Sequence, residues 1–456
     1  MGIVQDKSRP EERTRQGIES AMQVQFRTGL EAGPPLPAAN PLLLSAPALP
    51  LGKSAAVPQL APFLSGRRRT NASLAETRIL CISTTILGHK TMARRLVQAL
   101  DKLPAVQPTF VFLEPEDYLQ IPVPKWSRLT NPWHAQAIAR LKAKAFLRSS
   151  YDMLLLNAWE SVVAFRDLGR KLPTAALLDA VPETFHRQLE ARGVRGWKRE
   201  AAHRIHDWSF RIASRNVDLF LPMGSDCAES LQRHYGVDST RCLPPTLAPQ
   251  DLYALQGAAP AAASPLRLLF VGNDFLRKGG DFLLRMFAEH LAGACLLTIV
   301  SSDPVLDSMS LPEGVRRLRN LTPEQLRPLY EESHLFVFPT RQDFMPQVLA
   351  EALAAGLPCM ANDVGGIGDL VQHGDTGFLM PLQATPAVWA GHILNLASNP
   401  RERIRMACCS RQFAESKLGM ERFESLVREA VAKLRALGYS MGSRPALDYW
   451  KQPVQQ

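Results

Sequence analysis

Two acidic residues, Asp343 and Glu351, stand eight positions apart in the segment DFMPQVLAE. Asp343 follows the apolar run 335–338, which predicts a strand, and Glu351 lies more than one turn into the helix predicted after it. Both side chains can therefore point into one cleft, with the amino end of the helix between them. Such an end offers unpaired N–H groups and the positive end of the helix dipole, which suit a diphosphate. The carboxylates suit hydroxyl groups.

Glycine-containing segments flank this pair on both sides. The segment FVGNDFLRKGG (270–280) predicts a strand, a glycine turn and a basic pair before a helix. Downstream stand DVGGIGDLV (363–371) and GDTGFL (374–379). We expect three phosphate-binding loops at the ends of successive strands. Without these neighbours, two acids at this spacing would indicate no more than ordinary surface carboxylates.

The order of these features resembles the C-terminal domain of family 4 glycosyltransferases (glycosyl transferases group 1). It reads strand-Gly-x5-Lys-Gly, acid-x7-Glu-Ala, Ala-x-Gly-x-Pro, Gly-Gly and Gly-x-x-Gly between Leu266 and about Leu434. The N-terminal half is similar more loosely, over 217–226, 234–237 and 243–245. The resemblance implies a GT-B fold, an α/β architecture in which two Rossmann-like doubly wound parallel-sheet domains face a cleft. It also implies transfer of a sugar, with retention, from a nucleoside diphosphate sugar to a hydroxyl acceptor, which is a glycan, a lipid or a small molecule.

The same resemblance implies roles for single residues. Lys278, helped by Arg277, neutralises the donor diphosphate, and Glu351 accepts hydrogen bonds from the ribose hydroxyls. Asp343 and the backbone of the residues after it face the transferred sugar and the phosphates. The implied catalytic residues are Asp343, Lys278, Arg277 and Asp179, and the implied donor-binding residues are Gly272, Asn273, Phe344, Met345, Pro346, Gln347, Val348, Glu351, Gly365 and Gly366.

Three positions depart from the family pattern. Asn273 stands where the family usually has Arg, so Arg277 would have to supply the missing guanidinium. Asp343 is one methylene shorter than the usual Glu. Asp179, in LLDAVP, stands where many members have a His that faces the sugar, and the alternative is that Asp179 only caps a turn before the proline.

These departures leave a second function open, which is a catalytically degenerate GT-B protein that binds a nucleotide, a glycan or a partner without turnover. We favour the enzyme because the lysine, the second acid and the glycine loops are all present. His89 and His186 are predicted to be surface or packing residues. The chain has no Asp-x-Asp triplet, so we expect no metal ion and no cofactor besides the nucleotide-sugar co-substrate.

The chain divides into five parts. Residues 1–75 predict a flexible Pro/Ala-rich extension, and 251–265 predict a linker. Strand candidates alternate with helical stretches in the acceptor domain predicted at 76–250 and in the donor domain predicted at 266–420, which favours parallel sheets in both. Residues 421–456 predict a C-terminal helix and a tail.

Sequence signals mark the ends of two helices in the donor half. Thr322 and Gln325 have the spacing of a capping box. A helix from about Pro346 to Ala355 is predicted to stop at Gly356.

Composition and charge bear on the location of the protein. The seven cysteines are scattered, which favours reduced thiols and a cytoplasmic protein. No apolar run is long enough to cross a bilayer. The net charge of +10 and the acid-free stretch 118–151, with Trp126 and Trp133, suggest peripheral contact with an anionic membrane at its inner face, although a solvated helix face fits the same stretch. We expect no nucleic-acid partner.

Overall fold

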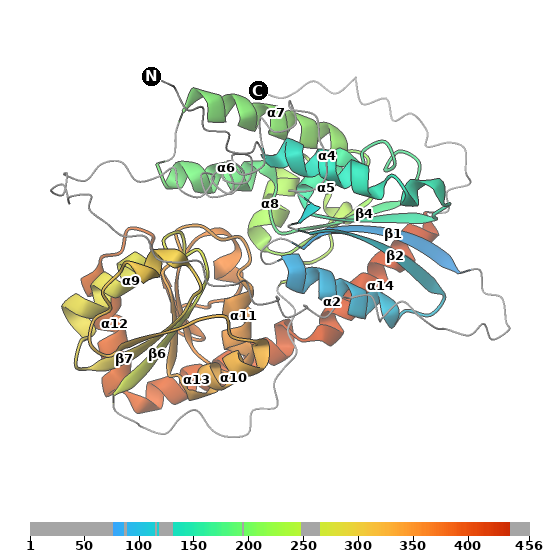
Figure 1. Cartoon of the computed structure of the whole chain (residues 1–456). Coiled ribbons are helices and arrows are strands. Elements are labelled where there is room, and N and C mark those ends of the chain that lie inside the picture. Colours follow the sequence, from blue (N-terminus) through green and yellow to red (C-terminus); the bar gives the residue numbers. More distant parts are fainter. Residues whose placement is uncertain are drawn as a thin grey trace, which may run out of the picture.

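The protein folds into two parallel α/β domains (Figure 1). The computed structural model describes residues 76–85, 89–114, 116–117, 131–193, 196–247 and 265–437. The predicted extension and nearly all of the predicted linker lie outside these residues, as does the tail after residue 437.

The N-terminal domain is built on a parallel sheet with the order β2-β1-β3-β4-β5. Its strands are β1 (Thr77–Thr84), β2 (Val106–Leu113), β3 (Met153–Asn157), β4 (Thr174–Leu178) and β5 (Leu219–Pro222). The central strands β3 and β4 are buried at every position, because helices cover both faces of the sheet. The predicted doubly wound sheet is thus confirmed.

The helices of this domain form two layers. They are α2 (His89–Asp101), α4 (Asn131–Ala143), α5 (Trp159–Ala164), α6 (Pro182–Ala191), α7 (Trp197–Ser214) and α8 (Ser225–Arg233), with the short η3 (Phe146–Arg148) and η4 (Ser239–Arg241). Successive residues of β1 enter different cores, since Ile79 packs in the cluster that contains Met92 of α2, and Leu80 in the cluster that contains Phe210 of α7.

The C-terminal domain has a six-stranded parallel sheet with the order β11-β10-β9-β6-β7-β8. Its strands are β6 (Leu266–Val271), β7 (Cys295–Val300), β8 (Val315–Leu318), β9 (Leu335–Phe338), β10 (Cys359–Asn362) and β11 (Gly377–Met380). Its helices are α9 (Gly280–Met286), α10 (Pro323–Glu332), α11 (Gln347–Ala354), α12 (Pro386–Ser398), α13 (Pro400–Lys417) and α14 (Met420–Ala436), with the shorter η5 (Phe287–Leu291), η6 (Pro304–Asp307) and η7 (Gly365–Asp369).

The predicted helix boundaries are confirmed. At the start of α10, the Thr322 hydroxyl accepts from the N–H of Gln325, and the Gln325 side chain accepts from the N–H of Thr322. At the end of α11, Gly356 adopts a φ of 70°, and its N–H donates to the carbonyl of Leu353. This left-handed residue ends the helix as the glycine signal predicts.

The third predicted phosphate loop is wrong. Strand β11 pairs in parallel with β10, with Cys359 opposite Gly377. The segment 374–377 therefore enters β11 at the amino edge of the sheet, whereas the loops after β6, β9 and β10 leave from the carboxyl edge. A phosphate bound at the loops after β6, β9 and β10 would therefore not contact the segment 374–377.

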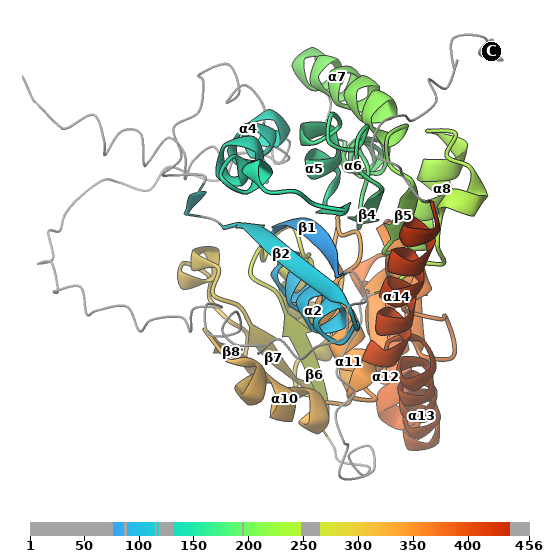
Figure 2. The same cartoon turned by 90° about the vertical axis from the view of Figure 1, so that its right-hand side faces the viewer.

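The last described helix returns to the N-terminal domain. Helix α14 lies beside α2 in both views (Figures 1 and 2). Lys102 Nζ lies 2.6 Å from Glu424 Oε1, and Arg435 Nε donates to Thr77 Oγ1 at 2.9 Å. Phe423 is 1% exposed in the same cluster as Met92. The predicted C-terminal helix therefore couples the two domains.

Replacing Phe423 by Ala should leave a cavity where α14 packs. We expect the free energy of unfolding to fall by about 3–5 kcal/mol, measured by urea unfolding. The control is Leu437→Ala at the end of α14, where the side chain is half exposed and a change within about 0.5 kcal/mol is expected. Equal effects of the two variants would contradict this account of α14.

Candidate functional site

A buried ion pair joins the ends of two neighbouring strands in the C-terminal domain. Lys278 belongs to the turn after β6, and Asp343 to the loop after β9, which pairs with β6. Lys278 Nζ donates to Asp343 Oδ2 at 3.0 Å, and the two side chains are only 15% and 17% exposed. The ammonium also lies 4.8 Å from the ring centre of Phe338. A fixed cation and a fixed anion thus stand at the carboxyl edge of this sheet.

Arg277 lies against the same pair and is 10% exposed. Its Nε donates to Asp274 at 2.6 Å, and another guanidinium nitrogen lies 3.6 Å from Asp343 Oδ2. The same guanidinium donates to the backbone carbonyl of Gln342. Arg277 therefore ties the loop after β6 to the loop after β9.

The charge of Asp343 follows from these neighbours. Burial alone would raise the pKa of the carboxyl group. The positive charges of Lys278 and Arg277, together with their hydrogen bonds, outweigh burial and hold the pKa below its usual range. Asp343 is therefore ionised at neutral pH, and the site holds one carboxylate between two cations.

Two glycines allow the loops to approach so closely. At Gly279, with a φ of 76°, an added Cβ would lie 1.9 Å from the carbonyl oxygen of Pro339. At Gly365, with a φ of 56°, it would lie 2.2 Å from the carbonyl oxygen of Asp343. Both positions combine a left-handed backbone with a backbone contact that no side chain tolerates.

The other expected donor-site residues surround this pair. Asn273 accepts from the N–H of Ser302 at 2.9 Å, which fastens the β6 turn to the loop after β7. Gly366 donates to the carbonyl of Phe344 at 2.7 Å. Met345 is buried. Pro346 is the N-cap residue of α11, and Gln347 and Val348 are in its first turn. A Cβ added to Gly272 would collide with the Lys278 side chain. All of them lie in the loops after β6, β9 and β10 or at the start of α11.

Glu351 lies one turn into α11 and is half-buried. Its Oε2 accepts from the Tyr330 hydroxyl at 2.9 Å. Burial raises the pKa of Glu351, although the Tyr330 bond and the charge of Arg95 on α2 act in the opposite direction. The carboxyl group therefore lies within the electrostatic reach of the N-terminal domain. Tyr330 carried no signal in the sequence, because it comes from a different helix.

The carboxyl edges of the two sheets face each other. The ring of Phe185 on α6 lies 6.0 Å from that of Phe344. Three hydrogen bonds cross between the domains, from Gln188 Nε2 to the Asp343 carbonyl (2.8 Å), from the Ser225 N–H to Asp369 (2.5 Å), and from Arg192 to the Gln342 side chain. The loops of the expected donor site therefore contact the N-terminal domain directly.

Asp179 belongs to the N-terminal domain and follows β4 directly. The N-cap of α6 is Val181, whose backbone bonds to the Thr184 hydroxyl, so Asp179 does not cap this helix. Instead its Oδ2 lies 3.5 Å from Nε2 of His89, which was predicted to be a surface or packing residue. His186 of α6 stacks on His203 of α7, so the prediction of a packing residue holds for His186.

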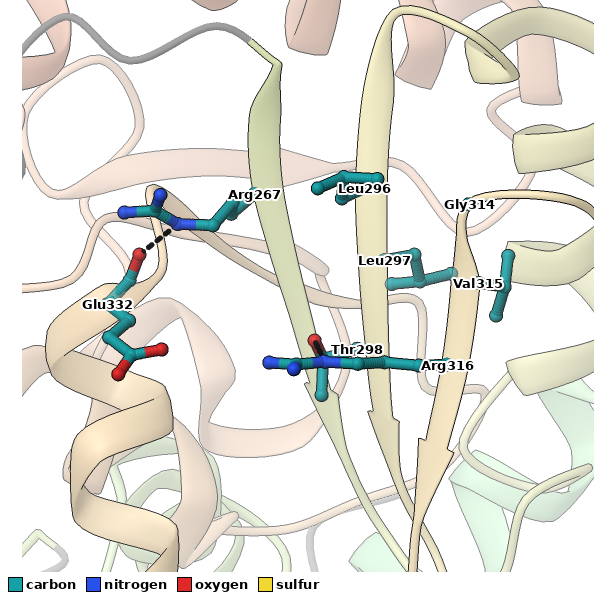
Figure 3. Close-up of a pocket in the computed structure, with 8 residues that line it drawn as sticks. All are labelled: Arg267, Leu296, Leu297, Thr298, Gly314, Val315, Arg316 and Glu332. Atoms are coloured by element: carbon teal, nitrogen blue, oxygen red, sulfur yellow. Dashed lines mark hydrogen bonds between the residues drawn. The ribbon is translucent and has the colours of Figure 1, made fainter.

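A separate cavity of about 460 Å³ lies at the other end of the C-terminal sheet (Figure 3). Its lining residues come from the amino ends of β6, β7 and β8 and from the end of α10, and they are Arg267, Leu296, Leu297, Thr298, Gly314, Val315, Arg316 and Glu332. It is therefore remote from the Lys278–Asp343 pair. Within the described part of the chain, no three His, Cys, Asp or Glu side chains group as metal ligands.

Gly365→Ala should disturb the site more than a matched glycine change. Gly374 also has a positive φ, of 84°, but an added Cβ there meets nothing within 4 Å. Gly374→Ala should therefore show backbone strain alone, roughly 1–2 kcal/mol. Gly365→Ala should lower the unfolding free energy further and raise hydrogen exchange in residues 339–346. Indistinguishable variants would mean that the Gly365 contact does not hold this loop.

The C-terminal domain matches a known family. Residues 265–399 match the family model described as Glycosyl transferases group 1. The D-inositol 3-phosphate glycosyltransferase of Rhodococcus erythropolis (strain PR4 / NBRC 100887) is 30% identical over 254 residues, covering 50% of this chain and 56% of that protein. The chain spans about half the length of the curated relatives it matches.

Solved structures extend the likeness to both domains. Sucrose-phosphate synthase from Thermosynechococcus elongatus has a TM-score of 0.65 at 16% identity, covering 80% of this chain and 100% of that chain. Anabaena HepE in complex with UDP-glucose has a TM-score of 0.57 at 14% identity, covering 78% and 100%. At these identities the likeness concerns the fold. The chain thus has the GT-B fold, and its segment 265–399 is similar to the group 1 glycosyltransferases.

Proposed function

We propose that the protein transfers a sugar from a nucleoside diphosphate sugar to a hydroxyl acceptor, with retention of anomeric configuration. The observation that carries the proposal is the Lys278–Asp343–Arg277 cluster at the carboxyl edge of the group 1 domain, opposite a second sheet. Anabaena HepE, which is similar to this chain in fold, was solved with UDP and with UDP-glucose. These two complexes support a nucleoside diphosphate sugar as the donor.

The diphosphate would bind at Lys278 and at the start of α11. When the donor enters, its negative oxygens would replace Asp343 as the partner of the ammonium. As the bond between the anomeric carbon and the phosphate oxygen breaks, negative charge grows on the leaving diphosphate. A preorganised ammonium and the positive end of the α11 dipole would stabilise that charge. A donor phosphate oxygen would take the acceptor proton. We propose that no metal ion and no further cofactor take part.

Glu351 and Arg277 would serve this donor in different ways. Glu351 would accept hydrogen bonds from the ribose hydroxyls, with Tyr330 holding its carboxyl group. Arg277 is largely enclosed by Asp274, the Gln342 carbonyl and Asp343. It therefore acts as a positioning residue, which fixes the Asp343 loop and adds positive charge beneath the diphosphate.

We also propose that an anionic membrane is a partner, at its cytoplasmic face, through α7. In the acid-free stretch, the cations Arg140 and Lys142 are paired with Asp167 and Asp117, and part of the stretch lies outside the described residues. Helix α7 lies at the top of both views (Figures 1 and 2). The spacing of Trp197 (78% exposed), Ile205 and Trp208 (61% exposed) puts them on one face of this helix.

Basic residues flank this face of α7. Arg204 is 79% exposed and lies 3.3 Å from Glu200 of the same helix, and Arg211, on the same side, lies 3.5 Å from Asp207. Unlike the pairs of the acid-free stretch, both of these lie beside the exposed tryptophans. Tryptophan and isoleucine beside arginine on one helix suit the interface of a membrane with anionic lipids. None of the described helices is long and apolar enough to span a bilayer, so this contact would be peripheral.

The function is tested by a screen of UDP, GDP, ADP and their sugars. A ligand at one hundred times its dissociation constant should stabilise the protein by about 2.7 kcal/mol in thermal unfolding. The donor found in this way should then support transfer of radiolabelled sugar. Binding without hydrolysis or transfer would favour the catalytically degenerate alternative, to which Asn273 and Asp343 point.

Lys278→Ala should reduce turnover by about a hundredfold to a thousandfold, because a preorganised cation is lost at the leaving group. Arg277→Ala should reduce turnover nearly as strongly, through the position of the Asp343 loop. Arg285→Ala, on the exposed side of α9, is the control and should retain parental turnover. Parental rates for both Lys278→Ala and Arg277→Ala would show that the donor site has been misplaced.

Replacing both Trp197 and Trp208 by Ser should weaken binding to anionic vesicles by about tenfold or more, since each indole loses apolar contact with the lipid. Co-sedimentation with phosphatidylglycerol vesicles, with phosphatidylcholine vesicles as reference, measures this. The matched control replaces Val388 and Ile404, two exposed apolar residues of the C-terminal domain, by Ser. The membrane contact would be refuted if the wild-type protein does not co-sediment with anionic vesicles, or if it dimerises through these tryptophans.

A further inference from the structure

The cavity at the amino edge of the C-terminal sheet contains two arginines without a carboxylate partner. Arg267 belongs to β6 and Arg316 to β8, and β7 lies between these strands. Within the described part of the chain, neither guanidinium group forms an ion pair. The next arginines along β8 differ, since Arg317 and Arg319 both contact Asp307. The cavity therefore holds positive charge that the described residues leave unneutralised.

The strand register places both arginines on the same face of the sheet. Arg267 is the register partner of Leu296 on β7, and Arg316 is the register partner of Thr298 on the same strand. Leu296 and Thr298 are two positions apart, so their side chains point to the same face. Arg267 and Arg316 therefore flank β7 on that face.

Each guanidinium group is fixed through its Nε atom. Arg267 Nε donates to the backbone carbonyl of Glu332 at 2.6 Å, and Arg316 Nε donates to the hydroxyl of Thr298 at 2.8 Å. The terminal nitrogens of both groups have no partner among the described residues. Figure 3 shows the Arg316 side chain running across β7 toward the side of the cavity where Arg267 and Glu332 lie. Two oriented guanidinium groups thus keep their terminal N–H groups for a ligand.

A buried histidine holds the backbone of Arg267. The N–H of Arg267 donates to His334 Nδ1 at 2.8 Å, and the N–H of His334 donates to the Arg267 carbonyl at 2.8 Å. Burial lowers the pKa of His334 to about 4, and the charges of Arg267 and Arg403 act in the same direction. His334 is therefore neutral at pH 7 and anchors Arg267 without adding charge.

The charges of the lining residues indicate what would bind. A phosphate monoester, whose second pKa is about 6, carries two negative charges at pH 7 and can accept bidentate bonds from both guanidinium groups. A carboxylate would neutralise only one of them. The exposed carboxylate of Glu332 accepts hydrogen bonds and suits a hydroxyl group. Leu296, which is 44% exposed, offers an apolar contact beside these polar groups.

We infer that this cavity binds a hydroxylated phosphate monoester, a sugar phosphate, with its phosphate at Arg267 and Arg316 and its hydroxyl groups at Glu332. The volume of about 460 Å³ lies in the range of small-molecule sites. Arg316 and Glu332 are exposed, so the ligand can enter without a rearrangement of the chain.

This site is separate from the donor site. Strand β6 spans about 13 Å between Arg267 and Val271, and Lys278 follows beyond the end of the strand. A small ligand in the cavity therefore cannot reach the Lys278–Asp343 pair. The inference does not rest on the proposed function, and a nucleotide at the carboxyl edge should leave the cavity accessible.

Isothermal titration calorimetry of the full chain with glucose 6-phosphate, glucose and methyl phosphate tests the inference. Glucose 6-phosphate should bind about tenfold more tightly than methyl phosphate, because only the former offers hydroxyl groups to Glu332. Glucose without a phosphate should give no binding at about 1 mM. Saturating UDP should change the dissociation constant of glucose 6-phosphate by less than about twofold, and the titration without UDP stands alone if UDP does not bind.

Four variants assign the binding to these residues. Arg267→Gln and Arg316→Gln should each weaken binding of glucose 6-phosphate about tenfold or more, because each removes a charged donor. Glu332→Gln should weaken binding of glucose 6-phosphate but not of methyl phosphate, since it removes an acceptor for hydroxyls and a negative charge near the phosphate. Arg428→Gln, on the exposed side of α14, is the control and should bind as the parent does. Arg316 is exposed on an edge strand, so its variant keeps the test valid if Arg267→Gln fails to fold.

Three results would overturn the inference. The first is the absence of glucose 6-phosphate binding at about 1 mM. The second is parental affinity in both Arg267→Gln and Arg316→Gln. The third is displacement of glucose 6-phosphate by UDP, which would place the phosphate at the donor site instead. Failure of every nucleotide to bind would count against the proposed function and leave this site unaffected.

Discussion

The ion pair between Lys278 and Asp343 is the interaction on which the rest of the site depends. Both charges are largely removed from water, so loss of either would leave the other uncompensated, at a cost of about 3–5 kcal/mol. Arg277 and the glycine at position 365 hold the two loops in the geometry that the pair needs. A donor diphosphate can enter this arrangement because it offers Lys278 a second anion in place of the first.

The Lys278–Asp343 pair can serve a transfer reaction only because the second domain lies opposite it. A parallel sheet exposes its loops at one edge, and two such edges must face each other before a donor and an acceptor can meet. Helix α14 packs beside α2, and Gln188 and Ser225 bond directly to the donor-side loops. The same contacts that join the domains therefore hold the donor-side loops against the N-terminal domain.

Local signals were sufficient for most of the fold. Alternating strand and helix candidates predicted a parallel sheet in each domain, and Thr322 and Gly356 marked helix ends, because these features depend on near neighbours. Strand β11 was missed because it is four residues long and begins with a glycine, so it resembled a loop. His89 was predicted to be a surface or packing residue because its partner, Asp179, lies ninety positions away, and the contact of Arg277 with Asp343 was hidden for the same reason.

A crystal structure of the full chain with bound UDP would test the central claim most directly. The account predicts the diphosphate at the carboxyl edge of the C-terminal sheet, with a phosphate oxygen within hydrogen-bond distance of Lys278 Nζ and the uridine ribose beside Glu351. Asp343 would then have released part of its contact with Lys278. A nucleotide bound elsewhere, with the Lys278–Asp343 bond unchanged at 3.0 Å, would contradict the account.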